Sequence, residues 1–265
     1  MQLKNKNAVV YGAGGAIGGA VARAYAREGA RLFLAGRTSA KVEAVARQIV
    51  ADGGRAEAAE VDALDKASVD AHAAHVAASG SLDISFNAIG VHHVQGASLL
   101  SLATGDFLLP ITTYSTTQFL TTTAAARHMK AQRSGVILTL STTAARMSLP
   151  SNGFGPACAA VEALSRQLAG ELASYGVRVV CLRPDGMPET VAYGSHAGEV
   201  WEHAAERMAE MAGTRADIDP GGPGALLGRP VTLAEVAATA VFLASPGAGG
   251  MTGTVTSVTA GSLLD

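Results

Sequence analysis

Residues 8–18 read Ala8-Val9-Val10-Tyr11-Gly12-Ala13-Gly14-Gly15-Ala16-Ile17-Gly18. This stretch joins a short apolar run to a glycine-rich turn, and a helical pattern follows near 16–28. Glycines let a backbone turn tightly and approach a pyrophosphate, while the amino end of a helix offers free N–H groups and partial positive charge. The stretch predicts a strand–turn–helix unit that holds a dinucleotide phosphate, although such a turn can also be only a tight turn. The rest of the chain decides between these interpretations.

Short apolar runs and longer helical patterns alternate along the whole chain. Further strands are predicted over 31–35, 56–61, 82–86, 136–140, 177–181 and 254–259. Further helices are predicted near 39–52, 65–79, 104–131, 155–174, 199–212 and 232–244. This alternation predicts an α/β fold with a doubly wound parallel sheet, a Rossmann-type three-layer sandwich. We expect one domain over 1–265, with a lid or substrate loop over about 184–230.

Composition excludes several classes of function. Charged residues make up only 16% of the chain, and the net charge of −2 comes with no basic run, so neither nucleic acid nor an acidic membrane is an expected partner. No stretch is apolar enough over about 20 residues to predict a membrane span. Cys158 and Cys181 show neither metal-ligand spacing nor a disulfide framework. We therefore expect a cytoplasmic protein without a metal site.

Several motifs together resemble the short-chain dehydrogenase/reductase family over essentially the whole chain. The glycine motif is similar to the family's Thr-Gly-x-x-x-Gly-Ile-Gly, with Tyr11 at the threonine and Ala16 at the middle glycine. Residues 83–90, Asp-Ile-Ser-Phe-Asn-Ala-Ile-Gly, resemble the family's Asp-Ile-Leu-Val-Asn-Asn-Ala-Gly. The stretch from Gly228-Arg229-Pro230 to Gly253 looks like the family's C-terminal segment. The resemblance implies a nicotinamide-dinucleotide oxidoreductase.

Cofactor contacts follow from this resemblance. The residues concerned are Gly12, Gly14, Gly15, Ala16, Ile17 and Gly18 at the pyrophosphate, Asp62 and Ala63 at the adenine, and Asn87, Ala88 and Gly90 at the nicotinamide-ribose side. In this interpretation Asp62 accepts a hydrogen bond from the adenine amine. The alternative for Asp62 is a cap on the helix predicted at 65–79.

The end of the second predicted strand bears on the choice of cofactor. An acidic residue there would bind a ribose 2′-hydroxyl and repel a 2′-phosphate. Gly36 holds that place and Arg37-Thr38-Ser39 follow, so a guanidinium and two hydroxyls are available to a phosphate. This pattern favours NADP(H) over NAD(H). Alternatively, Arg37 is a solvated charge and Thr38 or Ser39 only caps the next helix.

The positions that carry catalysis in the family are unusual here. Phe154 stands at the place of the tyrosine that acts as general acid, and Cys158 at the place of the lysine that lowers that tyrosine's pKa. The family's asparagine corresponds to Tyr114. Its serine corresponds to Ser141, which lies 13 residues before Phe154, or to Thr142 if the alignment follows Pro150. The resemblance thus implies weak or absent ketone reduction, because a general acid contributes roughly 10²–10⁴-fold.

Other groups are candidates for the missing acid. Tyr114 offers a phenol or only fills space, and His92 and His93 are either proton donors or surface residues. Cys158 has no basic neighbour in sequence to favour a thiolate. An apolar lid is expected from Met187, Tyr193, Trp201, Met208 and Met211.

The expected function is hydride transfer, by a non-standard NADP(H) site, to or from a small and hydrophobic organic substrate. An activated double bond or an iminium suits such a site better than a simple ketone. The alternative is a catalytically silent nucleotide-binding protein, acting as a sensor or scaffold subunit. The helix predicted at 104–131 contains an uncharged, threonine-rich run over 107–126. Together with the helix at 155–174 it predicts a homo-oligomer, a dimer or tetramer, because related proteins pair these helices.

Overall fold

A computed structural model describes residues 1–147, 152–193 and 225–264. Its strands are β1 (Asn7–Tyr11), β2 (Arg31–Gly36), β3 (Arg55–Glu60), β4 (Ile84–Asn87), β5 (Gly135–Leu140), β6 (Val177–Pro184) and β7 (Val255–Val258). Its helices are α1 (Ala16–Arg27), α2 (Ser39–Ala51), α3 (Lys66–Ala78), α4 (Thr104–Gln132), α5 (Phe154–Leu172) and α7 (Leu233–Ala244). Short 3₁₀ turns are η1 (Thr143–Ala145), η2 (Ala173–Tyr175), η3 (Pro188–Tyr193) and η4 (Pro246–Ala248). The helix predicted near 199–212 lies outside the described residues.

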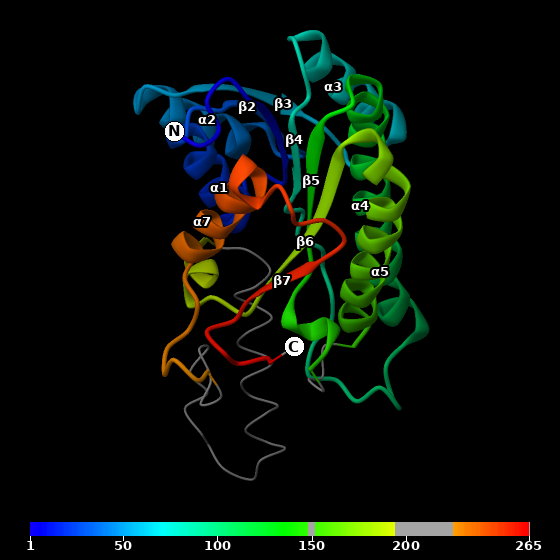
Figure 1. Cartoon of the computed structure of the whole chain (residues 1–265). Helices are drawn as coiled ribbons and strands as arrows, with labels where there is room; N and C mark the ends of the chain where they lie inside the picture. Colours follow the sequence, from blue (N-terminus) through cyan, green and yellow to red (C-terminus); the bar gives the residue numbers. More distant parts are fainter. Residues whose placement is uncertain (148–151, 194–224, 265) are drawn as a thin grey trace.

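All seven strands are parallel and lie in the order β3-β2-β1-β4-β5-β6-β7. Helices α1, α2 and α7 cover one face of the sheet, and α3, α4 and α5 cover the other (Figure 1). The prediction of a doubly wound α/β sandwich is therefore confirmed. From β1 the chain adds β2 and β3 on one side and then β4 to β7 on the other, so the order of the strands reverses between β1 and β4. Open α/β sheets bind their ligands at the carboxyl ends of the strands at such a point.

Burial on both faces explains the apolar strands. In β1, Ala8 and Val10 belong to the core beneath α1 and α7, whereas Val9 and Tyr11 belong to the core beneath α3 and α4. Successive side chains of a strand point to opposite faces, so a central parallel strand must be apolar throughout. The edge strand β3 reads Arg-Ala-Glu-Ala-Ala-Glu and is only partly buried. Burial thus decreases from the centre of the sheet to its edge.

The turn after β1 requires glycine at two positions. Gly12 has a φ of 75°, and a Cβ there would lie 2.6 Å from the Ala88 carbonyl oxygen. A Cβ on Gly18, in the first turn of α1, would lie 2.3 Å from the Gly12 carbonyl oxygen. The helix therefore packs directly on the backbone of the turn, and the turn packs on the backbone that follows β4. These contacts fix the amino end of α1 beside the carboxyl end of β4.

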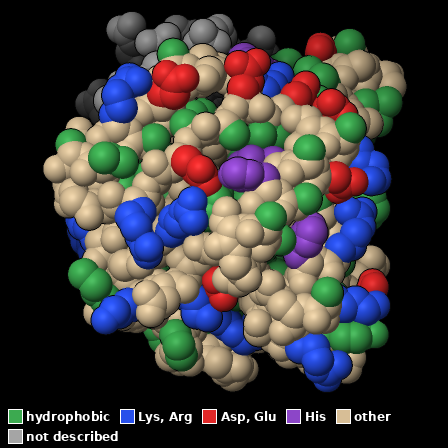
Figure 2. Space-filling view, turned by 90° about the horizontal axis from the view of Figure 1, so that it is seen from above, with side chains coloured by type: hydrophobic (Ala, Val, Ile, Leu, Met, Phe, Trp, Pro, Cys, Tyr) green, Lys and Arg blue, Asp and Glu red, His purple; other side chains and the backbone are tan. Residues whose placement is uncertain are grey.

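The face over the amino ends of the strands carries both signs of charge. Figure 2 shows Lys and Arg side chains interspersed with Asp and Glu there. One ion pair of this end joins Lys6, before β1, to Asp83, before β4, at 3.1 Å. A mixed surface attracts no polyanion, because attraction of that kind needs a patch of one sign. No helix within the described ranges is long and apolar enough to cross a membrane.

Two glycine-to-alanine substitutions test the packing of the turn. We expect Gly18→Ala to destabilise the protein by about 1–3 kcal/mol, because its Cβ would overlap the Gly12 carbonyl. Gly170→Ala is the matched control: Gly170 lies in α5 with nothing within 4 Å of a Cβ, so alanine should stabilise by about 0.5–1 kcal/mol. Urea unfolding measures both. Equal stability of Gly18→Ala and wild type would contradict the packing described here.

Candidate functional site

A cleft of about 520 Å³ lies where the strand order reverses. Its lining comes from five segments: four lie at or just after the carboxyl ends of β1, β2, β3 and β4, and the fifth is part of α4. The lining residues predicted from sequence are Gly12, Gly14, Gly15, Arg37, Thr38, Asp62, Ala63, Ala88 and Gly90. Four predicted residues are not in the lining, namely Ala16, Ile17, Gly18 and Asn87. The structure thus gathers most of the predicted cofactor residues around one cavity.

The amino end of α1 faces this cleft without a side-chain cap. Gly15, the N-cap residue, is extended with φ −88° and ψ 173°, and no side chain accepts a hydrogen bond from the first turn. The first turn contains no acidic residue. The free N–H groups and the helix dipole therefore remain available to an anion. Ala16, Ile17 and Gly18 supply this first turn, which is their observed contribution to the site.

The end of β2 places cationic and hydroxyl groups along the cleft. Arg37 is exposed and has no ion-pair partner in the described part of the chain. Thr38 is the N-cap residue of α2, but its side chain makes no capping hydrogen bond. The Ser39 hydroxyl instead donates to Glu43 at 2.8 Å. Lys41, which the sequence interpretation missed, lines the same cleft from the first turn of α2. Its place in the first turn of the helix that follows β2 was the available signal.

Asp62 is exposed at the cleft, and it does not cap α3. Its Oδ1 accepts a hydrogen bond from the Leu64 N–H at 3.0 Å, which shapes the turn after β3. The N-cap of α3 is Asp65, whose Oδ1 accepts from the Ala67 N–H at 2.9 Å. The alternative interpretation of Asp62 as a helix cap is therefore wrong.

Asn87 supports the site from beneath rather than lining it. Its side chain is buried, and Nδ2 donates to the Thr117 carbonyl at 3.2 Å and to Thr121 Oγ1 at 2.8 Å. Its Oδ1 accepts from the Ile89 N–H at 3.0 Å. Asn87 thus ties the loop after β4 to α4, and this tie sets the positions of Ala88 and Gly90. The sequence analysis expected this helix to contribute to the site through Tyr114, whereas α4 lines the cleft through Leu109, Thr113 and Thr117.

The two hydroxyl candidates after β5 have different partners. Ser141 is fully buried, and its Oγ donates to Glu162 Oε1 at 2.8 Å. Thr142 Oγ1 lies 3.6 Å from Cys158 Sγ and accepts from the Ala144 N–H at 3.2 Å. The Ser141 side chain therefore points into the interior, and Thr142 is the hydroxyl residue that contacts Cys158.

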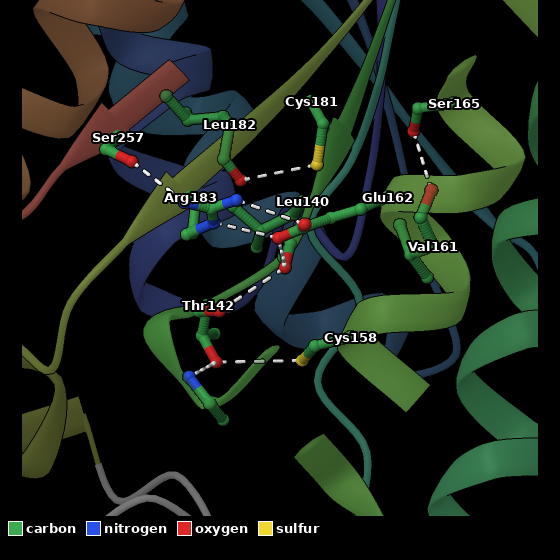
Figure 3. Close-up of polar contacts among 12 residues, drawn as sticks. Leu140, Thr142, Cys158, Val161, Glu162, Ser165, Cys181, Leu182, Arg183 and Ser257 are labelled. Atoms are coloured by element: carbon green, nitrogen blue, oxygen red, sulfur yellow. Dashed lines mark hydrogen bonds and ion pairs between the residues drawn. The ribbon is translucent and has the colours of Figure 1, made fainter. Parts of the chain in front are cut away.

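A buried ion pair receives the Ser141 hydrogen bond. The Arg183 guanidinium at the end of β6 contacts the Glu162 carboxylate of α5 twice, Nε to Oε1 at 2.8 Å and Nη2 to Oε2 at 3.1 Å. Arg183 Nη1 also donates to Ser257 Oγ of β7 at 3.1 Å. Figure 3 shows Glu162 reaching from α5 to Arg183 between the strands. The paired, hydrogen-bonded charges join β5, β6, β7 and α5 at one corner.

Phe154 and Cys158 lie in an apolar cluster beside that corner. The cluster comprises Val91, Tyr114, Ala157, Cys158 and Val161, with Ile111, Ala145 and Phe154 packed against it. Burial raises the pKa of the Cys158 thiol to about 11, so the thiol is neutral near pH 7. A neutral buried thiol is neither a nucleophile nor a source of positive field.

Tyr114 belongs to this cluster, and its phenol is already engaged. Its Oη donates to the Leu140 carbonyl oxygen at 2.6 Å, and the side chain is buried. Burial raises the pKa of the phenol well above its usual value, and nearby Cys158 and Cys181 add to the effect. The hypothesis that Tyr114 supplies the missing acid is therefore not supported by the geometry. Its role is to fill volume and to tie α4 to the end of β5.

The two histidines occupy different places at the cleft. His92 lines the cavity. The His93 ring stacks on Phe154, with centroids 4.1 Å apart and planes 9° from parallel. His93 Nδ1 lies 3.0 Å from the Val91 carbonyl oxygen and Nε2 lies 2.7 Å from Gln95 Nε2. Phe154 and His93 thus form an aromatic pair at the edge of the apolar cluster.

Only the two ends of the expected lid, residues 184–193 and 225–230, are described. Met187 is buried, and Glu189 Oε2 accepts a hydrogen bond from the Leu233 N–H at the amino end of α7, at 2.6 Å. Tyr193 ends η3. Trp201, Met208 and Met211 lie outside the described residues. Within residues 1–147, 152–193 and 225–264, no group of three or more His, Cys, Asp or Glu could hold a metal ion.

Comparison with known proteins agrees with this fold. A family model described as enoyl-(acyl carrier protein) reductase matches residues 12–262. D-threitol dehydrogenase of Mycolicibacterium smegmatis is 33% identical over 93% of this chain and 88% of its own length. Galactitol 2-dehydrogenase (L-tagatose-forming) of Cereibacter sphaeroides is 32% identical, with 98% of this chain and 96% of that protein covered.

A solved structure extends the likeness to three dimensions. It is that of a putative NAD(P)-dependent gluconate 5-dehydrogenase from Beutenbergia cavernae, described with bound NADP at low occupancy. It is 29% identical to this chain, with a TM-score of 0.81 and 98% of each chain covered. The fold, the glycine turn and these relatives agree, and the chain belongs to the short-chain dehydrogenase/reductase family of NAD(P)-dependent oxidoreductases.

Proposed function

We propose that this protein is an NADP(H)-dependent oxidoreductase whose site holds a cofactor but lacks the family's acid. It transfers hydride to or from a small, hydrophobic organic substrate. The observation that carries the proposal is the apolar cluster: Phe154 and Cys158, at the positions we assign to the family's tyrosine and lysine, lie among apolar side chains beside Thr142. A phenyl ring has no proton to give, and the buried thiol carries no charge.

The cleft fits a phosphorylated dinucleotide. Gly12 leaves no room for a Cβ, the uncapped amino end of α1 suits a pyrophosphate, and Asp62 keeps one carboxylate oxygen for an amine donor. Arg37, Thr38 and Lys41 offer two cations and a hydroxyl to a 2′-phosphate. Bound there, the nicotinamide supplies hydride chemistry. The chain's residues bind and orient the cofactor, and the NADP named in the Beutenbergia cavernae structure is consistent with this preference.

The apolar cluster also limits the substrate. Reducing a ketone or oxidising an alcohol requires a proton to move on or off oxygen as hydride is transferred. Without an acid or base at that oxygen, such reactions lose roughly 10²–10⁴-fold. Two relatives are named for the polyols threitol and galactitol. We infer a different substrate here, one that accepts hydride with little proton help, such as an activated double bond or an iminium. Thr142 would orient the acceptor.

Three further proposals concern the whole protein. The described strands form one sheet, which supports a single domain over 1–265. Both cysteines are free and buried, which supports a reducing cytoplasm.

The α4 helix exposes 53% of Phe119, and a large apolar side chain in the middle of a helix face supports a homo-oligomer built through α4 and α5. The alternative function, a silent nucleotide-binding subunit, would show cofactor binding without turnover.

The cofactor preference is tested by titrating NADPH and NADH. We expect wild type to bind NADPH more tightly. We also expect Arg37→Ala and Lys41→Ala each to lose about tenfold or more of this preference, because a hydrogen bond to a charged group contributes roughly 1.5–3 kcal/mol. Arg47→Ala is the control: Arg47 lies on the same helix but pairs with Glu43 at 3.5 Å. Equal affinities for both cofactors in wild type would refute the assignment.

Restoring the acid tests the role of the cluster. Phe154→Tyr with Cys158→Lys should raise simple ketone reduction by about 10²-fold over a weak wild type. Phe154→Tyr alone should gain less, because a phenol without a nearby cation keeps a pKa near 10. Cys158→Ala should change ketone reduction little. Initial rates with NADPH measure all four proteins. Fast ketone reduction by wild type would show that the proton comes from another group, and His92→Ala and His93→Ala would then identify it.

Assembly is tested by light scattering at micromolar concentration. Wild type should form a dimer or tetramer, and Phe119→Asp should shift it toward the monomer because an unpaired buried charge is costly. Phe242→Asp is the control, since Phe242 is 44% exposed on α7, away from α4 and α5. A monomeric wild type would refute the proposed assembly.

A further inference from the structure

Gly14 lies where the glycine turn, residues 12–15, meets the first turn of α2. Its φ is not positive, so the backbone conformation does not itself require glycine there. A Cβ on Gly14 would lie 2.8 Å from the Lys41 Cβ and 3.4 Å from the Lys41 carbonyl carbon. The shorter distance is well below the roughly 3.5–4.0 Å at which carbon atoms pack. Position 14 therefore needs glycine because α2 packs directly against the turn.

A second glycine gives α2 room on its other side. Gly36 ends β2, and a Cβ there would lie 3.0 Å from Cγ2 of Val42, the buried residue that follows Lys41. Both glycines line the cleft, together with Lys41 and Val42. The first turn of α2 thus approaches the ends of β1 and β2 closely because two side chains are missing there.

The contact between the glycine turn and α2 has a stiff side and a soft side. The turn is tied to β2, since the N–H groups of Gly12 and Ala13 donate to the Ala35 carbonyl oxygen at 2.8 and 3.2 Å. The first turn of α2 is less constrained, because the side chain of its N-cap residue Thr38 makes no capping hydrogen bond. A methyl group added to the turn would therefore displace the start of α2, and Lys41 with it.

The position of Lys41 matters because its charge is not used within the described part of the protein. Lys41 forms no ion pair over residues 1–147, 152–193 and 225–264, and the nearby Glu43 pairs with Arg47 instead. Lys41 is exposed at the cleft, as is Arg37. Coulomb attraction falls with distance, so moving the backbone of Lys41 away from the cleft weakens its attraction to a phosphate held there.

We propose that Gly14 is a specificity-determining residue, because its missing side chain lets α2 place the Lys41 ammonium against the 2′-phosphate of NADP(H). The inference rests on the proposed function and extends it to a residue that acts by positioning another. NADH has no 2′-phosphate and gains nothing from this placement. A side chain at Gly14 should therefore weaken the binding of NADPH and leave that of NADH nearly unchanged.

Gly14→Ala is the informative variant, because it adds only the methyl group that would meet Lys41. Calorimetry measures the Kd of NADPH and of NADH, and thermal unfolding without cofactor checks that the protein is folded. The Kd of NADPH should rise by about 3- to 10-fold, a part of the roughly 10- to 100-fold that a hydrogen bond to a charged group contributes, while that of NADH should change less than about twofold. Gly170→Ala is the control, since a Cβ there meets nothing within 4 Å.

A double-mutant cycle with Lys41→Ala tests whether Gly14 acts through the ammonium. Alanine keeps the Cβ that Gly14→Ala would meet and removes the charge, so the packing change is the same in both backgrounds. In the Lys41→Ala protein, Gly14→Ala should have little further effect on the Kd of NADPH, and the two effects should be far from additive. Additive effects would show that Gly14 acts on the cofactor without Lys41, and would overturn the inference.

Gly36→Ala supplies the same test if Gly14→Ala does not fold. It presses on the same turn of α2 through Val42, with a milder contact of 3.0 Å. It should weaken NADPH binding more than NADH binding, and this difference should disappear in the Lys41→Ala background. An equal loss for both cofactors, in either background, would contradict the proposed placement of Lys41.

The outcomes separate this inference from the proposed function. A wild-type preference for NADPH that Gly14→Ala leaves intact would keep the proposed function and overturn the inference. An equal loss of NADPH and NADH affinity in Gly14→Ala would do the same, because it would place the added methyl group against the pyrophosphate that both cofactors share. A preference that depends on Gly14 and Lys41, with no turnover of any substrate, would keep the inference and refute the proposed oxidoreductase function. Equal affinities in wild type would overturn both.

Discussion

The buried contact between Arg183 and Glu162 is the interaction on which the geometry of the substrate end depends. It joins the end of β6 to α5, and its further hydrogen bonds reach Ser141 after β5 and Ser257 in β7. Such a pair contributes little net stability, because desolvation offsets the attraction. Removing one partner, however, would leave an unpaired charge inside the protein. The pair therefore acts as a geometric constraint on four elements at once.

That constraint gives three consecutive hydroxyl residues three different partners. The Ser141 hydroxyl donates to Glu162 of the ion pair and so points inward. The Thr142 hydroxyl contacts the Cys158 thiol, and the Thr143 hydroxyl donates to Asp185. On one side of the turn is an apolar cluster with no proton to give, and on the other side is a fixed negative charge. Our proposal of an acceptor that needs no acid follows from the apolar side of this turn. At the opposite end of the site, Gly12 and the amino end of α1 are positioned independently of this corner, and there we propose that the cofactor binds.

The sequence predicted the fold and most of the residues that line the cleft, because both depend on local patterns. Parallel strands buried on two faces are apolar throughout, and a glycine turn before a helix is contiguous in sequence. The substrate end depends on contacts between distant segments, which pattern cannot reveal. Examples are Tyr114 Oη on the Leu140 carbonyl and Asn87 on Thr121. Asp185 was grouped with the lid loop, although β6 extends through Pro184 and makes it part of the sheet's edge.

The central claim is that hydride transfer here takes place without a coupled proton transfer from the protein. The most direct test is to measure isotope effects on reduction of cyclohexenone in the pre-steady state. Deuterium at the transferred position of NADPH should slow the hydride step. Replacing H₂O by D₂O should leave that step unchanged, because protonation by water follows it. A solvent isotope effect on the same step would show that a protein acid acts with the hydride, and would contradict the claim.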